Sequence, residues 1–414
     1  MKSRLLRPVE VLAAWLVLIS LQTAAAAQGR IVAIGDVHGA LPEFESILRE
    51  TGLLDAKRGA GGGWAGGRTV LVQLGDLVDR GPKTRACLDL MMELERTSQK
   101  RKSGKVVTLL GNHEVMAMTG DMRYVSPEDY QSFADGQSEK VRQNAYKDYL
   151  GFMAERADLA GVAPAQPISA QKWMAEHPLG FFERRDAFGP LGVYGRWLRQ
   201  RNVTYQSEDI VFVHGGLSPN LPFDDIGDLN DQMRGALQTF DREWQSLVKA
   251  GIIWRYMTMD EAVLEVQRER AAIPLREVEN TKLKEELEKF INLMTWLVSR
   301  DNPVWYEGLA NQPEAGLGPS LDVMMMRLKI GAIVAGHTVM PDFQIHQRFG
   351  NRVFLIDTGM LRAEFGGTAS ALEIQDGRFT AHSAGQPPRT LATRGAAAGR
   401  GASPAASGRG VRQP

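Results

Sequence analysis

The stretch Ile31-Val32-Ala33-Ile34-Gly35-Asp36-Val37-His38-Gly39 joins a short apolar run to a loop that carries a carboxylate and an imidazole. An apolar run of this length, rich in β-branched residues, is typical of a strand that is buried on both faces. Asp36 and His38 are alternate residues leaving that run, so both side chains could reach one metal ion. The stretch therefore predicts a strand that presents metal ligands at its carboxyl end.

Four later loops repeat this arrangement. Each follows an apolar run and places Asp, Asn or His beside glycine: Gly75–Gly81 (GDLVDRG), Gly111–Glu114 (GNHE), His214–Gly216 (HGG) and Gly336–Thr338 (GHT). Carboxylate and amide oxygens and imidazole nitrogens are ligands that divalent first-row metals accept. Five such loops in order predict a metal centre built from several strand ends.

Seven apolar runs rich in Val, Ile and Leu have the length of strands. They are Arg30–Ile34, Thr69–Leu74, Lys105–Leu110, Ile210–Val213, Ile330–Ala335, Arg352–Ile356 and Ala371–Ile374. Helical patterns separate the first three runs, and this alternation predicts an α/β fold in which neighbouring strands end at the same edge of a sheet. Two long, mostly helical inserts, at about 116–205 and 220–300, leave and return beside the motif loops, so we expect them to form a helical cap over the metal end.

Together the loops supply a ligand set for two metal ions. Two ions about 3.5–4 Å apart need a bridging ligand, and Asp76 could place its carboxylate between them. Asp36 and His38 would then complete the coordination of one ion. The coordination of the other ion would be completed by Asn112, His214 and His337.

The five loops resemble, in the same order, the motifs of the phosphoprotein-phosphatase branch of the calcineurin-like metallophosphoesterases. The stretches Gly120–Val125, Pro303–Tyr306 and Ile356–Met360 resemble those of the bacterial-type Shewanella-like phosphatases. This resemblance implies an αββα sandwich of two mixed sheets flanked by helices, with helical cap inserts. It also implies two divalent metal ions, for which Mn, Fe, Zn and Co all suit these ligands.

The same resemblance implies a role for each matching residue. Asp36 and His38 match ligands of the first metal, and Asp76 matches the bridging ligand. Asn112, His214 and His337 match ligands of the second metal.

The remaining matching residues correspond to residues of the family that act on the substrate. His113 matches the family's general acid, Asp79 matches the carboxylate that holds that histidine, and Arg80 matches a phosphate-binding arginine. A second phosphate-binding arginine is expected after Trp305-Tyr306, where this chain has Glu307. Arg123 and Arg255 are the candidates to replace it.

The predicted reaction is hydrolysis of a phosphomonoester by metal-bound hydroxide, with a phosphoprotein (Ser/Thr or Tyr) or a small phosphomonoester as substrate. One alternative is a dinucleoside polyphosphate hydrolase, for which five arginines offer a basic cluster: Arg184, Arg185, Arg196, Arg199 and Arg201. Another is a non-catalytic binding protein with a metal-stabilised fold.

Composition and the chain ends complete the prediction. Lys+Arg and Asp+Glu both number 49 in the 414 residues, so charge indicates neither a nucleic-acid partner nor an anionic membrane surface. Basic residues, an apolar stretch (Val11–Leu21) and a small-residue end (Ala24–Ala27) predict a signal peptide over residues 1–27 and a periplasmic or secreted protein, free of the membrane after cleavage. We expect a catalytic domain over 28–384 and a disordered tail of Gly, Ala, Pro and Arg over 385–414. The sequence sets no oligomeric state.

Overall fold

The computed structural model describes residues 29–55, 63–101, 104–159, 168–272 and 281–394. The predicted signal peptide, residues 1–27, lies outside the described residues, as does the end of the predicted tail from residue 395. Among the described residues, no helix is both long enough and apolar enough to span a bilayer.

The strands form two mixed sheets. The larger has the order β11-β10-β9-β1-β2-β3 and the smaller the order β4-β5-β6-β8-β7. In the larger sheet β1, β2 and β3 run parallel, and in the smaller sheet β5, β6 and β8 run parallel. The strands are β1 (Ile31–Ile34), β2 (Val70–Gln73), β3 (Lys105–Thr108), β4 (Thr204–Ser207), β5 (Ile210–Val213), β6 (Ala332–Ala335), β7 (His346–Arg348), β8 (Val353–Leu355), β9 (Ser370–Gln375), β10 (Arg378–Ser383) and β11 (Arg389–Thr393).

The two sheets pack face to face, and alternation along the strands builds the layers. In β1, Ile31 and Ala33 join a buried cluster that contains residues of both sheets, whereas Val32 and Ile34 pack on the other face with the helices. Phe354 of β8 and Phe379 of β10 stack across the interface with ring centroids 4.3 Å apart. The predicted αββα sandwich is therefore confirmed.

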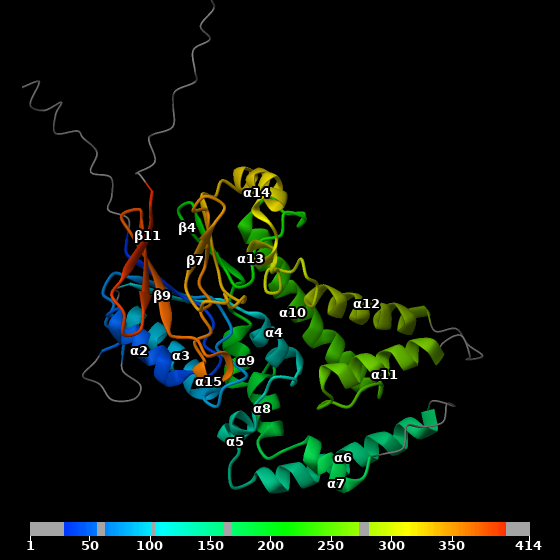
Figure 1. The fold of residues 1–414 in the computed structure, drawn as a ribbon. Helices are drawn as coiled ribbons and strands as arrows, with labels where there is room; N and C mark the ends of the chain where they lie inside the picture. Colours follow the sequence, from blue (N-terminus) through cyan, green and yellow to red (C-terminus); the bar gives the residue numbers. More distant parts are fainter. Residues whose placement is uncertain (1–28, 56–62, 102–103, 160–167, 273–280, 395–414) are drawn as a thin grey trace, which may run out of the picture.

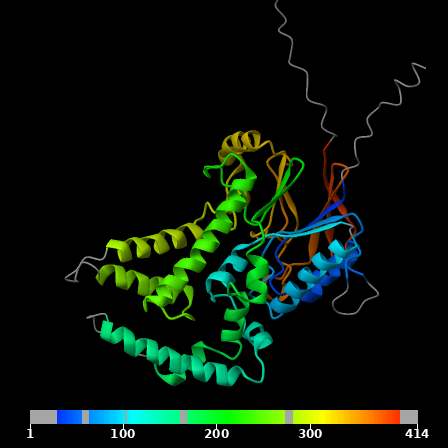
Figure 2. The same cartoon turned by 180° about the vertical axis from the view of Figure 1, so that it is seen from behind.

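Helices cover the sandwich and extend beyond it (Figure 1). Helices α2 and α3 cover the larger sheet, and the inserts supply α4 to α12. The helices are α2 (Leu41–Glu50), α3 (Thr84–Lys100), α4 (Asn112–Thr119), α5 (Pro127–Phe133), α6 (Ser138–Leu159), α7 (Ala170–Glu176), α8 (Phe181–Phe188), α9 (Val193–Leu198), α10 (Ile226–Lys249), α11 (Met259–Ala272), α12 (Thr281–Leu297), α13 (Gly308–Asn311), α14 (Glu314–Leu328) and α15 (Arg362–Phe365). Seen from behind, the long helices α6, α10, α11 and α12 project to one side of the two sheets (Figure 2).

The prediction of a disordered tail from residue 385 is wrong for its first part. Strand β11 pairs antiparallel with β10, and the pairing extends the larger sheet to Thr393. Backbone hydrogen bonds stabilise this edge strand even though few of its side chains are large and apolar, and Ala392 is buried against the sandwich core. The ordered structure therefore continues past the predicted boundary at residue 384.

Candidate metal centre

The motif loops of both sheets meet at the carboxyl ends of the parallel strands. Asp36 and His38 follow β1, Asp76 follows β2, and Asn112 begins α4 just after β3. His214 and His337 follow β5 and β6 of the other sheet. The strand ends lie beside α4 and α15, where the sandwich borders the cap (Figure 1). All six predicted ligands are therefore brought to one place.

One group of ligand atoms gathers around His38. Its Nε2 lies 3.8 Å from Asp36 Oδ2 and 3.6 Å from Asp76 Oδ2. Its Nδ1 lies 2.9 Å from the carbonyl oxygen of Val78, which can only accept a hydrogen bond. Nδ1 therefore carries the ring proton, and Nε2 presents its lone pair to the carboxylates, as a metal ligand must.

A second group gathers around His214. Its Nε2 lies 2.9 Å from Asn112 Oδ1, 3.2 Å from His337 Nδ1 and 3.4 Å from Asp76 Oδ2. Its Nδ1 donates to the carbonyl oxygen of Leu74 at 3.1 Å, which fixes the ring in the ligating orientation. Asp76 takes part in both groups, so its carboxylate lies where a bridging ligand is predicted.

These distances suit a pair of bound cations. Ligand atoms that share an ion at about 2.0–2.2 Å lie roughly 3 Å apart when their bonds to the metal are at right angles, close to the spacing around His214. Burial is the main cause that lowers the pKa of His38 and of His337 to about 3, so both rings are neutral and can donate a lone pair. The chain thus offers two preformed ligand groups in suitable protonation states.

The negative charge at the centre also requires a counterion. Burial, together with Asp357 and Asp76, raises the pKa of Asp36 well above its ordinary value. Burial raises the pKa of Asp357 to about 6. Asp357 was not among the predicted site residues. Its position directly after β8, in a stretch already noted for its resemblance, was the available signal. Three buried carboxylates facing one another favour the binding of divalent cations there.

Tight turns shape the ligand loops. Backbone φ is positive at five non-glycine residues of the centre, namely His38 (48°), Asp76 (56°), Asp79 (67°), Arg80 (63°) and His337 (65°). Left-handed backbone is disfavoured for such residues, and it clusters at functional sites. A Cβ on Gly111 would lie 2.1 Å from Asp76 Oδ1, and one on Gly336 would lie 2.6 Å from Asp36 Oδ1, so these glycines admit the carboxylates.

Glu114 fixes the loop of the bridging ligand. Its Oε2 accepts from the backbone N–H of Asp76 at 2.7 Å and of Gly111 at 2.9 Å, and its Oε1 accepts from Leu77 at 2.8 Å. These three hydrogen bonds, all accepted by one buried carboxylate, join the loops after β2 and β3. Glu114 is thus a positioning residue for Asp76.

His113 and Asp79 form the predicted pair. His113 Nδ1 lies 2.8 Å from Asp79 Oδ2, and His113 Nε2 lies 3.9 Å from Asp76 Oδ2, facing the ligand groups. Burial alone would lower the pKa of His113, but the carboxylates of Asp76 and Asp79 outweigh it, so the net shift is upward. The pair therefore favours a protonated imidazole whose Nε2–H points toward the centre.

A family comparison gives the identity of this centre. The family described as calcineurin-like phosphoesterase matches residues 29–341, which contain all six ligands and the His113–Asp79 pair. The chain belongs to the calcineurin-like phosphoesterase family. The match covers more than half of the chain, and the predicted resemblance is confirmed.

Within the calcineurin-like phosphoesterase family, the chain is similar to relatives named Shewanella-like protein phosphatases. The chain is 32% identical to Shewanella-like protein phosphatase 2 of Arabidopsis thaliana over 222 residues. This match covers 53% of this chain and 54% of the relative, so the chain spans about half of that relative's length. It is 24% identical over 335 residues to Shewanella-like protein phosphatase 1 of Plasmodium berghei, covering 80% of this chain and 67% of the relative.

A solved structure shares the fold of this phosphoesterase. The cold-active protein-tyrosine phosphatase of a psychrophilic Shewanella species superimposes with a TM-score of 0.55 at 21% identity, over 88% of this chain and 80% of that one. At this identity the likeness concerns the fold alone.

Arg184 joins the His113–Asp79 pair, a contact that the sequence did not reveal. Arg184 of α8 donates from Nη2 to Asp79 Oδ1 at 2.5 Å and from Nε to Asp129 Oδ2 at 3.0 Å. The side chains of Arg184, Asp79 and Asp129 are all fully buried. Arg184 thus anchors the carboxylate that holds His113, and it reaches the sandwich from the cap.

Arg80 lies at the mouth of the centre. Its guanidinium stacks over Tyr124 at 4.5 Å and over Phe365 at 5.3 Å. The Tyr124 ring is 5.1 Å from His113, and the Phe365 ring is 5.8 Å from His38. Arg80 Nη1 also donates to Glu364 at 3.2 Å. Two aromatic rings therefore position Arg80 beside the residues predicted to act on the substrate.

The two candidates for a second phosphate-binding arginine lie elsewhere. Arg123 donates from Nε and Nη2 to the carboxylate of Asp121, and its side chain is half exposed. Arg255 lies in the cap, where it stacks on Tyr256 at 4.5 Å. Among the described residues, neither arginine forms a hydrogen bond or an ion pair with a predicted ligand.

Glu307 does lie at the centre. Its Oε1 is 3.7 Å from His337 Nε2, and its side chain is more than half exposed. The family's expected arginine is thus replaced by a carboxylate beside the second ligand group. An anionic group on that side of the mouth would be repelled.

Proposed function

We propose that the chain is a two-metal phosphomonoesterase that acts as a protein phosphatase on Ser/Thr or Tyr phosphomonoesters after export to the periplasm or the medium. The observation that carries the reaction type is the convergence of six ligands from two sheets around the shared carboxylate of Asp76, beside the His113–Asp79 pair. Export rests on the sequence of residues 1–27 alone.

Different residues of the site have different roles in the proposed hydrolysis. Divalent ions held by the two ligand groups would polarise the phosphoryl oxygens and lower the pKa of an attacking water molecule. Arg80 offers a planar pair of donors that suits two phosphoryl oxygens. His113 gives its Nε2 proton to the leaving oxygen as the P–O bond breaks, and Asp79 holds the ring in the orientation that this transfer requires.

The mouth of the centre favours a substrate with one phosphate group. Arg80 can bind a phosphoryl group on its side, whereas Glu307 beside His337 opposes a second anion. Similarity to relatives named protein phosphatases supports a phosphoprotein substrate.

The contacts disfavour dinucleoside polyphosphate hydrolysis. Of the five arginines that could have formed a basic cluster, Arg184 binds Asp79 and Asp129, Arg199 binds Asp241, and Arg201 binds Glu95. Paired guanidiniums are poor receptors for several phosphates. A non-catalytic binding role is disfavoured because it would not require the His113–Asp79 pair, whose geometry suits proton transfer.

Turnover of a matched substrate panel tests the proposal. Manganese-loaded protein lacking residues 1–27 should hydrolyse phosphotyrosine or phosphoserine peptides far faster than diadenosine tetraphosphate, and metal analysis should find two ions per chain. The opposite order of rates would refute the substrate assignment, and metal-bound protein without turnover would support the binding role.

A change of leaving group tests the role of His113. p-Nitrophenolate departs readily without a proton, whereas phenolate needs one. His113→Ala should therefore slow phenyl phosphate hydrolysis by about 10²–10⁴-fold and p-nitrophenyl phosphate hydrolysis much less. Equal losses on both substrates would remove His113 from the acid role.

A further inference from the structure

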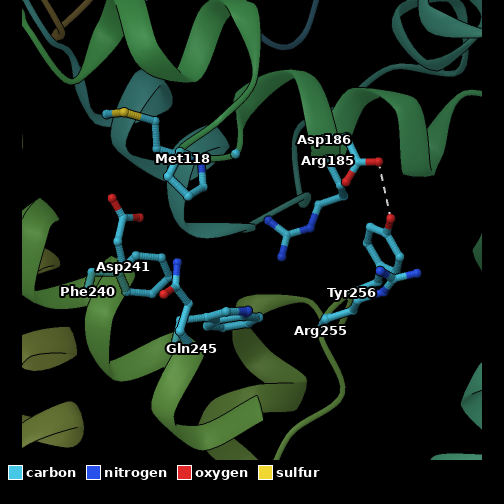
Figure 3. Close-up of a pocket in the computed structure, with 11 residues that line it drawn as sticks. Met118, Arg185, Asp186, Phe240, Asp241, Gln245, Arg255 and Tyr256 are labelled. Carbon is cyan, nitrogen blue, oxygen red and sulfur yellow. Dashed lines mark hydrogen bonds between the residues drawn. The ribbon is translucent and has the colours of Figure 1, made fainter. Parts of the chain in front are cut away.

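The cap contains a pocket that the metal centre does not use. It has a volume of about 170 Å³ and lies between α4, α8, α10 and the segment after α10. Its walls include Arg185, Phe240, Trp244, Gln245 and Tyr256. None of the residues that line it is a predicted metal ligand, so it forms a separate cavity (Figure 3).

Among the described residues, Arg185 at the wall of this pocket has no carboxylate within ion-pair distance, although Asp186 and Glu261 stabilise its charge from farther away. Its Nη2 donates to the carbonyl oxygen of Met257 at 3.2 Å, and its Nε is buried without a hydrogen-bond partner. In the described part of the chain, Arg185 forms no ion pair, in contrast to its neighbour Arg184. Burial and the adjacent charge of Arg184 lower the pKa of Arg185 to about 10, so the group is still cationic at neutral pH.

The carboxylates in the wall are already engaged. Asp241 receives two hydrogen bonds from Arg199, both at 2.7 Å. Asp186 accepts from the Tyr256 hydroxyl at 3.1 Å. Neither carboxylate forms an ion pair with Arg185, whose side chain points into the space between Met118, Gln245 and Tyr256 (Figure 3). The pocket therefore offers a positive group to an incoming anion.

Aromatic rings form the rest of the binding surface. The Arg185 guanidinium lies 5.6 Å from the ring of Trp244, and the Phe240 and Trp244 ring centroids are 5.4 Å apart. Flat apolar walls of this kind favour an aromatic ligand, which can stack on them while an attached anion meets the arginine.

The volume limits the size of that ligand. A cavity of about 150 Å³ can hold one benzene molecule, whereas pockets for drug-sized ligands are about 300–1,000 Å³. The pocket therefore matches a single ring better than a nucleotide. We infer that the cap pocket binds a small aromatic anion, one ring that carries a carboxylate or phosphonate group, with the anion on Arg185 and the ring against Trp244 and Phe240. This inference does not rest on the proposed phosphatase activity.

Calorimetric titration of the full chain with benzoate tests the inference. Arg185→Gln should weaken binding at least about ten-fold, since it removes the charged donor. Gln245→Trp should weaken it to a similar degree by filling the cavity while it leaves Arg185 in place. The matched control is Arg196→Gln, which changes an exposed arginine of the neighbouring α9 and should leave the affinity unchanged.

One further variant separates this pocket from the metal centre. Benzoate bound at the metal centre would be weakened by Arg80→Ala, whereas benzoate in the cap pocket would not. Absence of binding to the wild-type chain, unchanged affinity in Arg185→Gln, or a loss confined to Arg80→Ala would each overturn the inference. Melting curves establish that each variant is folded, and if Arg185→Gln does not fold, Gln245→Trp carries the test.

Discussion

Replacing Arg184 with methionine should destabilise the protein and impair its chemistry together. Methionine has a comparable length but no charge, so the variant leaves the carboxylates of Asp79 and Asp129 without their shared cation. Because all three side chains are fully buried, water cannot take the place of the guanidinium. Removing one partner of a buried ion pair costs about 3–5 kcal/mol.

That loss is large beside the total stability of a folded protein, about 5–15 kcal/mol. With an unfolding entropy of about 2.1 cal/mol/K per residue, a domain of about 350 residues loses roughly 1.4 °C per kcal/mol, so the melting temperature should fall by roughly 4–7 °C. The deficit should narrow as the pH falls. Burial already raises the pKa of Asp129 against the opposing effect of Arg184, and without Arg184 the folded state would bind a proton there more readily than the unfolded state.

Activity provides the second readout. Asp79 would keep its hydrogen bond to His113 but lose the anchor on its other oxygen, so phenyl phosphate turnover should fall. Arg201→Met is the matched control. It removes a partly buried ion pair to Glu95 that touches neither Asp79 nor His113, so its kcat should stay near the wild-type value.

A double variant separates charge from packing. Adding Asp129→Asn to Arg184→Met removes one of the two orphaned charges and should restore part of the lost stability. An Arg184→Met variant that melts within about 1 °C of the wild type, less than about 1 kcal/mol by the same scaling, and turns over normally would refute the reasoning.

Three other predictions concern the centre itself. Asp79→Asn removes one of the carboxylates that raise the pKa of His113. His113 should therefore lose its proton at lower pH, and the basic limb of the kcat/KM profile should move to lower pH. A basic limb that stays in place would contradict the pairing. Arg80→Ala should raise KM for p-nitrophenyl phosphate about ten-fold or more. Arg123→Ala should raise KM less, because Asp121 already binds the Arg123 side chain. Equal effects of the two substitutions would show that both arginines bind the phosphate. A chelator should lower the melting temperature, and Mn²⁺ should restore it, because a ligand at 100 times its Kd stabilises the native state by about 2.7 kcal/mol; identical melting curves would argue against native-state metal binding.

The sequence allowed the sandwich and the placement of the ligand loops to be predicted because both follow from local pattern. β1, β2 and β3 are short apolar runs, and parallel neighbours must end at the same edge of a sheet. Strands β4, β7, β10 and β11 were not predicted. They lie toward the sheet edges and carry polar or mixed side chains, so no apolar run marks them.

The support around the His113–Asp79 pair was beyond prediction for a different reason. Arg184 and Asp79 are 105 residues apart, and they meet only because α8 of the cap packs beside the motif loops. No periodicity or spacing encodes such a contact. The same holds for Arg185, which the sequence grouped with four other arginines and the structure separates from Arg199 and Arg201 by giving those two carboxylate partners.

The left-handed backbone of the centre carries a consequence for the stability of the chain. His38, Asp76, Asp79, Arg80 and His337 hold conformations that glycine or asparagine would adopt with less strain. Replacing one of these residues by glycine would therefore relieve backbone strain while it removes a predicted site residue. Stability and the predicted chemistry place opposite demands on these positions.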